Sequence, residues 1–336
     1  MDRLRTTTLA LILALMSWLA GLGISEGVSA AERTALTPVR PERCGPQRAT
    51  CEGFDAVVFV HGIYGDVDTF KNQATHFDWA ESFPSYFEEG QLIATPPGES
   101  GVDVFRLTYQ TELFSWAKGH ETHFDAIARK VFEVMKPLRV RRYRSIGFIA
   151  HSLGGNIVST YIHMVKSSLG HPQRSQHAFV VNLATPVLGS QIADIGSVLT
   201  SALGMNDALL KSLKENNLYL TMLDQFRREE QGKAERNACR AVHLHAAYET
   251  KYIGPLLVVT QASAAASISQ LVSSPVVGFT RNHFEMAKPS GVDDPLYKWV
   301  DDRVRAEYSR LLDWDTLVAQ APPKRKMCAS IDYIPE

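Results

Sequence analysis

The nonapeptide FIAHSLGGN, residues 148–156, holds the serine on which the fold prediction depends. The apolar run SIGFIA before Ser152 predicts a buried strand, and the residues from Leu153 onward have the spacing of a helix. A nucleophilic serine on a tight strand-to-helix turn needs small residues two positions before and two after it, because the strained turn crowds both neighbours. Ala150 and Gly154 meet this requirement, so we predict that Ser152 is a nucleophile. The alternative is a helix N-cap serine, which leaves the small residues on both sides unexplained.

Apolar runs that end at turn residues recur along the chain and predict a mostly parallel sheet. Helical stretches separate most of these runs, as in β-α-β units, and residues 123–135 and 154–165 are two such stretches. The runs expected to be strands are residues 56–62, 102–109, 145–152, 178–184, 241–249 and 256–260. Residues 189–240 contain no strand-like run and are expected to form a helical insertion between two strands.

Length and composition fit one large α/β domain as well as they fit two smaller ones. The chain has 336 residues and a formal net charge of -1, which gives no sign of the basic excess that nucleic-acid binding requires. We expect an α/β domain over residues 54–336, with its helical insertion at about 189–240, after an irregular lead-in over residues 31–53.

The first thirty residues read as a secretory signal peptide. A short basic start precedes an apolar run over residues 9–23, and the small residues of VSA before Ala31 suit cleavage after Ala30. An uncleaved anchor is the alternative, although the run is short for a bilayer span of roughly 20 residues. We therefore expect a secreted or periplasmic protein.

If the protein is exported, its four cysteines are expected to form two disulfides, because disulfides persist in oxidising compartments. Three pairings are open, and the short loop from Cys44 to Cys51 favours that bridge, which leaves Cys239 with Cys328. A zinc site is the alternative, but these spacings are not those of paired zinc-binding cysteines.

A serine nucleophile needs a base and an orienting acid, which follow it in the chain in the order acid, then histidine. His283 is the last of the eleven histidines and stands in a polar loop after the last expected strand. Glu249 directly follows a strand, whereas the other candidate acids fall within residues 189–240. We predict a Ser152–His283–Glu249 triad; a solvated carboxylate at a strand end is the alternative for Glu249.

Backbone amides must also stabilise the oxyanion that forms during acyl transfer. The amide of Leu153, at the start of a helix, is one candidate donor. The glycine-rich loop HGIYG, residues 61–65, offers the amide of Ile63 as the second. A phosphate cradle is the alternative for this loop, but no lysine stands in the P-loop position.

With these motifs in place, the chain resembles the α/β-hydrolase superfamily, in particular its lipase and GPI-inositol-deacylase-like serine esterases. The segments that carry the resemblance are VFVHGIYGD, AHSLGGN, LATPVLGS, VVTQASA and NHFEMAKP. The resemblance implies an eight-stranded sheet, helices that cap the site, and ester hydrolysis through an acyl-enzyme without a cofactor or metal. Glutamate at position 249 and alanine at position 150 depart from the usual aspartate and glycine.

The expected partner is a small-molecule or lipid ester. Leucines and a methionine concentrated between residues 203 and 223 suggest an apolar acyl pocket, and the cationic run over residues 136–144 is either a solvated loop or a contact for an anionic membrane surface. An acyltransferase with the same triad and a non-catalytic exported binding protein are the rival functions. The oligomeric state is left open, and the histidine pairs 243/245 and 120/123 are expected to pack or to lie on the surface rather than to bind metal.

Overall fold

In the computed structural model, the chain divides into two units, Met1–Arg33 and Thr34–Glu336. The structure describes residues 34–45, 47–51, 54–62, 65–83, 101–109, 124–168, 176–187, 217–235, 241–253, 257–265 and 276–319. The predicted signal peptide, the expected second oxyanion donor Ile63 and the cysteines Cys239 and Cys328 all lie outside these residues.

The described part of the second unit is built on a seven-stranded sheet with the order β1-β3-β2-β4-β5-β6-β7. All neighbouring pairs are parallel except β1 with β3. The strands are β1 (Ala35–Pro38), β2 (Phe54–Val60), β3 (Gly101–Thr108), β4 (Ser145–His151), β5 (His177–Leu183), β6 (His243–Glu249) and β7 (Val277–Phe279). The fold is the predicted α/β-hydrolase architecture, a mostly parallel sheet flanked by helices.

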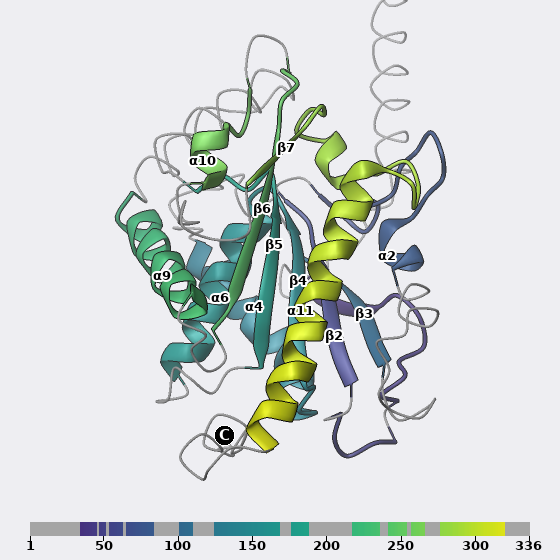
Figure 1. Ribbon diagram of the computed structural model, residues 1–336, viewed down its shortest axis with the longest axis vertical. Helices are drawn as coiled ribbons and strands as arrows, with labels where there is room; N and C mark the ends of the chain where they lie inside the picture. The colour runs from purple at the N-terminus through teal and green to yellow at the C-terminus, as the bar shows by residue number, and fades with distance from the viewer. Residues whose placement is uncertain are drawn as a thin grey trace, which may run out of the picture. The chain divides into compact units, whose positions relative to one another are not determined.

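The central strands β2, β4 and β5 are buried along their whole length. Near-continuous apolar runs of this kind are typical of parallel strands that are covered on both faces. Figure 1 shows the covering layers: α4 and α6 lie on one face of the sheet with α9 beside α6, and α11 crosses the opposite face. The helices are α2 (Trp79–Ser82), α4 (Phe124–Val134), α5 (Lys136–Val140), α6 (Gly154–Ser168), α9 (Asn217–Glu235), α10 (Gln261–Ala265) and α11 (Pro295–Ala319), with a 3-10 turn η3 (Glu285–Ala287).

Two expectations about strands are wrong. Residues 257–260, the described part of the run expected as a sixth strand, form a bent loop in which Val258 and Val259 are buried. The apolar side chains of this run are therefore buried by the packing of a loop. An apolar run alone does not distinguish such a loop from a strand. The lead-in expected to be irregular contains β1, a short strand that pairs with β3 at the sheet edge and ends at Pro38, where a missing amide is tolerated.

The lead-in is also tied to itself by the Cys44–Cys51 disulfide, the bridge that the short loop favoured. Both cysteines are buried, and the amide of Cys44 donates to the buried carboxylate of Asp103 on β3. The bridge thus closes a loop before β2, and the hydrogen bond from Cys44 to Asp103 fastens that loop to the sheet.

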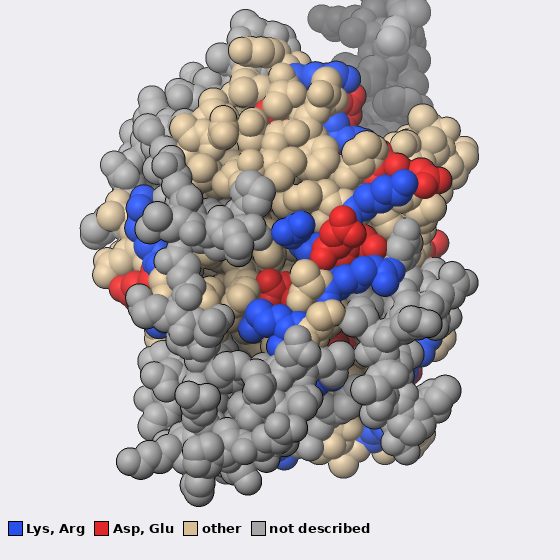
Figure 2. Space-filling model, viewed as in Figure 1, with Lys and Arg blue, Asp and Glu red and all other residues tan. Residues whose placement is uncertain are grey.

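The surface over α11 carries charges of both signs. Figure 2 shows basic and acidic side chains interspersed on this face, and ion pairs such as Lys298–Asp293, Arg305–Asp301 and Arg310–Glu307 join them. A patch of one sign, which nucleic-acid binding would need, is not seen on the described part of this face.

Candidate active site

Ser152 follows β4 directly and starts the turn into α6. Its φ of 55° lies in the left-handed region, which is strained for a residue with a side chain. The turn fits only because Gly154 follows: a Cβ on that glycine would lie 2.4 Å from the carbonyl oxygen of His61 and 2.7 Å from that of Val60. The serine therefore sits on a sharp strand-to-helix turn, as its small neighbours predicted, and not at an ordinary helix cap.

His283 contacts the hydroxyl of this serine. Its Nε2 lies 2.9 Å from Ser152 Oγ, and both side chains are almost completely buried. The histidine stands in the loop between β7 and η3, so a chain separation of 131 residues is closed by the sheet.

Glu249, the last residue of β6, lies on the other side of the imidazole. Its Oε1 is 3.4 Å from His283 Nδ1, and the same oxygen accepts a hydrogen bond from the amide of Val259. The carboxylate is fully buried, which rules out the solvated strand-end reading. The His283 Nδ1 contact has ion-pair distance without hydrogen-bond alignment, a common state of such pairs in unliganded enzymes.

The glycine-rich loop after β2 approaches the serine closely. A Cβ on Gly62 would lie 2.6 Å from the Cβ of Ser152. The preceding His61 stacks on Tyr109 with ring centroids 4.3 Å apart and accepts the Tyr109 amide at Nε2, 3.2 Å away. Burial lowers the pKa of His61, so the ring is neutral and holds the loop through hydrogen bonds.

Leu153, the expected first oxyanion donor, is buried at the start of α6. Among the described residues its amide donates no hydrogen bond, whereas the amides of Ser152 before it and of Gly155 and Asn156 after it each donate to a carbonyl oxygen. An amide left free beside Ser152 Oγ suits stabilisation of a developing negative charge.

The family model described as "Putative serine esterase (DUF676)" matches residues 52–234, which is more than half of the chain. The chain belongs to this serine esterase family. It is therefore a carboxylic ester hydrolase with the α/β-hydrolase fold.

Solved structures are also similar to this chain. The phospholipase PlaB from Legionella pneumophila is 16% identical with a TM-score of 0.51, and the match covers 78% of this chain and 62% of PlaB, less than two thirds of it. Esterase B from Lactobacillus rhamnosis is 13% identical with a TM-score of 0.47, covering 94% of this chain and 100% of that one. No curated protein matches this chain.

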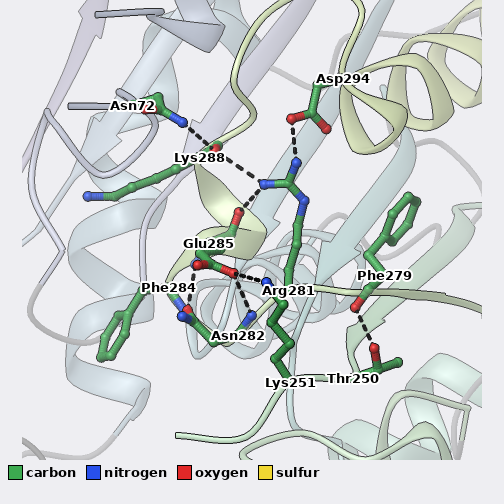
Figure 3. Close-up of polar contacts among 10 residues, drawn as sticks. All are labelled: Asn72, Thr250, Lys251, Phe279, Arg281, Asn282, Phe284, Glu285, Lys288 and Asp294. Carbon is green, nitrogen blue, oxygen red and sulfur yellow. Dashed lines mark hydrogen bonds and ion pairs between the residues drawn. The ribbon is translucent and has the colours of Figure 1, made fainter. Parts of the chain in front are cut away.

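The loop that carries His283 in this esterase is held by side chains that the sequence analysis missed (Figure 3). Arg281 forms an ion pair with Asp294 and donates from Nη1 to the carbonyl oxygen of Glu285 at 3.1 Å. Asn282 Oδ1 accepts the amide of Glu285 at 3.0 Å, while Glu285 Oε2 accepts the amide of Asn282 at 2.9 Å. This reciprocal pair has the hydrogen-bond pattern of a capping box, and the N-x-x-E spacing in the sequence was the signal that could have found it.

The same network connects the loop to neighbouring elements. Asp294 Oδ1 also accepts the amide of Leu296 at the start of α11, and Asn72 Nδ2 donates to the carbonyl oxygen of Lys288 at 3.0 Å. The His283 loop of the esterase is therefore braced by α11 and by the segment after β2.

Part of the predicted helical insertion flanks the sheet. Helix α9 packs against α6 and β6, and Arg227 reaches from it to Asn156 Oδ1 at 2.6 Å and to Ser159 Oγ at 3.0 Å. Of the apolar side chains expected to form an acyl pocket, the described ones are Met222, which is exposed, and Leu223, which is buried. Residues 188–216 lie outside the described part of the chain.

The cationic run over residues 136–144 lies before β4, at the end of that strand opposite Ser152. Arg141 pairs with Glu42 and Arg144 with Asp55, and the Arg139 guanidinium lies 4.0 Å from the ring centroid of Phe132. These three cations are thus engaged within the protein.

The histidine pair on β6 contacts a carboxylate of α11. His243 Nδ1 and His245 Nε2 lie 3.0 Å and 2.9 Å from the same oxygen of Glu307. Within the described ranges no group of three or more His, Cys, Asp or Glu side chains is arranged to hold a metal ion. His120 and His123 lie outside those ranges, and no helix inside them is long and apolar enough to cross a bilayer.

Proposed function

We propose that the esterase hydrolyses its substrate through a triad of Ser152, His283 and Glu249. The observation that carries the proposal is the 2.9 Å contact between His283 Nε2 and the hydroxyl of a serine held at positive φ. A serine hydroxyl is a weak nucleophile until a neighbouring base takes its proton, and this contact supplies the base.

In the proposed reaction, His283 takes the proton of Ser152 as Oγ attacks the ester carbonyl carbon. The amides of Leu153 and Ile63 bind the oxyanion of the tetrahedral intermediate. His283 then gives its proton to the leaving alcohol, and a water molecule, deprotonated by the same histidine, releases the acid from the acyl-enzyme. Glu249 accepts the Nδ1–H, keeps the imidazole in the correct tautomer and stabilises the imidazolium.

The proposed substrate is an ester of a lipid or of another acylated compound, and the proposed location is outside the cytoplasm. The apolar side chains concentrated between residues 203 and 223 support the first point, and the signal-like residues 1–30 support the second. The motifs that resemble GPI-inositol-deacylase-like esterases place the protein nearest that branch in this proposal.

The test is labelling with a fluorophosphonate, which reacts covalently with activated serines. Wild type should be labelled and Ser152→Ala should not. Ser168 is an exposed serine at the end of α6, and the control variant Ser168→Ala should be labelled like wild type. Equal labelling of wild type and Ser152→Ala would refute the nucleophile assignment.

The acyl pocket is tested separately with p-nitrophenyl esters of increasing chain length. We expect kcat/KM to rise with chain length as more apolar surface is buried. Activity that is flat along the series, or confined to the acetyl ester, would contradict a lipid substrate.

A further inference from the structure

His151, the residue before the nucleophile, reaches across to the main chain of the base. It is the last residue of β4, its side chain is buried, and its Nε2 lies 2.8 Å from the carbonyl oxygen of His283. The two imidazole rings are tilted against each other with centroids 4.9 Å apart. The nucleophile Ser152 therefore follows directly on the end of β4, and the residue before it contacts the backbone of His283, the base that activates it.

This contact fixes the chemical state of His151. A carbonyl oxygen only accepts, so Nε2 must carry the proton and donate it. Burial is the largest cause that lowers the pKa of His151 to about 3; the neighbouring His283 and Lys288 act in the same direction, and the hydrogen bond to the His283 carbonyl oxygen acts against them. The ring is therefore neutral at neutral pH, and because its Nε2 carries the proton, it cannot compete with His283 for the serine proton through Nε2.

The side chain of His283 is weakly fixed by its own contacts. Its Nδ1 makes no aligned hydrogen bond among the described residues, and Glu249 stands at 3.4 Å. The position of Nε2 relative to Ser152 Oγ therefore depends on where the backbone of the loop is held. The bracing in Figure 3 fastens the loop to α11 and to the segment after β2, while His151 joins it to the strand of the nucleophile itself.

We propose that His151 is a positioning residue, which sets the distance between base and nucleophile by holding the carbonyl group of His283. The inference rests on the proposed triad and adds a function for a side chain that the triad does not use. Positional errors of about 1 Å in such a pair cost on the order of 10²-fold in rate, so a single main-chain anchor has a measurable effect.

Substitutions at His151 that differ only in reach test the proposal. His151→Leu removes the donor, His151→Gln places an amide N–H near the former Nε2, and His151→Asn keeps the amide but ends one bond short. We expect kcat of the Leu and Asn variants to fall by roughly 10- to 100-fold with KM changed less than about threefold, and kcat of the Gln variant to return to within about fivefold of wild type.

His177→Leu is the matched control. This buried histidine at the start of β5 also contacts a hydrogen-bonding group through Nε2, the hydroxyl of Tyr161 at 3.0 Å, but it lies at the opposite end of the sheet from Ser152. It should lower the melting temperature about as much as His151→Leu and leave kcat unchanged. If His151→Leu does not fold, the Gln and Asn pair alone decides the question.

Two results would overturn the inference. One is a kcat for His151→Leu or His151→Asn that stays within about threefold of wild type. The other is a fall in kcat that His151→Gln does not reverse, since the donated hydrogen bond would then be irrelevant. Neither result touches the triad, whose nucleophile is tested independently by the reaction of Ser152→Ala with the fluorophosphonate probe.

Discussion

Gly62→Ala is expected to impair catalysis through a clash that the structure defines. The added Cβ would lie 2.6 Å from the Cβ and 3.2 Å from the Oγ of Ser152. Ordinary van der Waals contact begins at 3.4 Å, so the loop and the serine must separate by the difference of 0.8 Å. A displacement of this size at the reacting atom should reduce kcat on the order of 10²-fold, which corresponds to about 2.7 kcal/mol of transition-state stabilisation.

The measurement is steady-state kinetics on a p-nitrophenyl ester together with the melting temperature of each variant. Gly291→Ala is the matched control, because a Cβ at that position meets no atom within 4 Å and its backbone is not in the left-handed region. The control should keep full activity and gain up to about 1 kcal/mol of stability from the reduced entropy of the unfolded chain. If Gly62→Ala folds and keeps kcat within about twofold of wild type, the close approach of the loop does not position the serine, and the reasoning is wrong.

Three further predictions concern charged groups. Glu249→Gln should lower kcat on the order of 10²- to 10⁴-fold with little change in KM, measured by the same kinetics, because the amide cannot stabilise an imidazolium; full activity would exclude Glu249 from the triad. Lys166→Met should cost about 1–3 kcal/mol in urea unfolding, because the buried Glu230 loses one of its two ammonium partners and keeps Lys233, whereas the exposed control Lys298→Met should leave the unfolding midpoint unchanged. Although burial alone would raise the pKa of Glu307, hydrogen bonds from the two β6 histidines hold it below its ordinary 4.5; its contribution is present above about pH 4.5 and is lost as the pH falls through the lowered value. The difference in melting temperature between wild type and Glu307→Gln should therefore shrink below pH 4.5, and a constant difference would contradict this linkage.

The parts of the fold that the sequence predicted well are those where one local signal has one structural outcome. The apolar runs of β2, β4 and β5 are buried on both faces, and this is the pattern that distinguishes central parallel strands. The small residues around Ser152 likewise predict one structure, because only a tight turn needs small residues on both sides of the serine.

The parts that failed are those where tertiary context decides between outcomes. Residues 257–260 had the apolar composition of a strand, yet two of them are buried in a loop whose Val259 amide binds Glu249. Strand β1 has little β-propensity in its sequence ALTP and exists because β3 offers it an edge. The sequence of residues 257–260 does not show that they will contact Glu249, and the sequence of β1 does not show that it will pair with β3.

The choice of one base among the histidines near Ser152 shows what the sequence order leaves out. His61 donates from Nδ1 to the carbonyl oxygen of Gly62 and accepts the Tyr109 amide at Nε2, so both ring nitrogens are occupied. His151 has its Nε2–H committed to the carbonyl oxygen of His283. Of these three described histidines, His283 is the one whose ring nitrogen contacts Ser152 Oγ. Chain order selects the same histidine but gives no physical reason for it. The structural reason is that backbone groups fix the hydrogen bonds of His61 and His151. Burial also keeps both of these rings neutral, so that neither adds a positive charge beside the imidazolium that forms on His283.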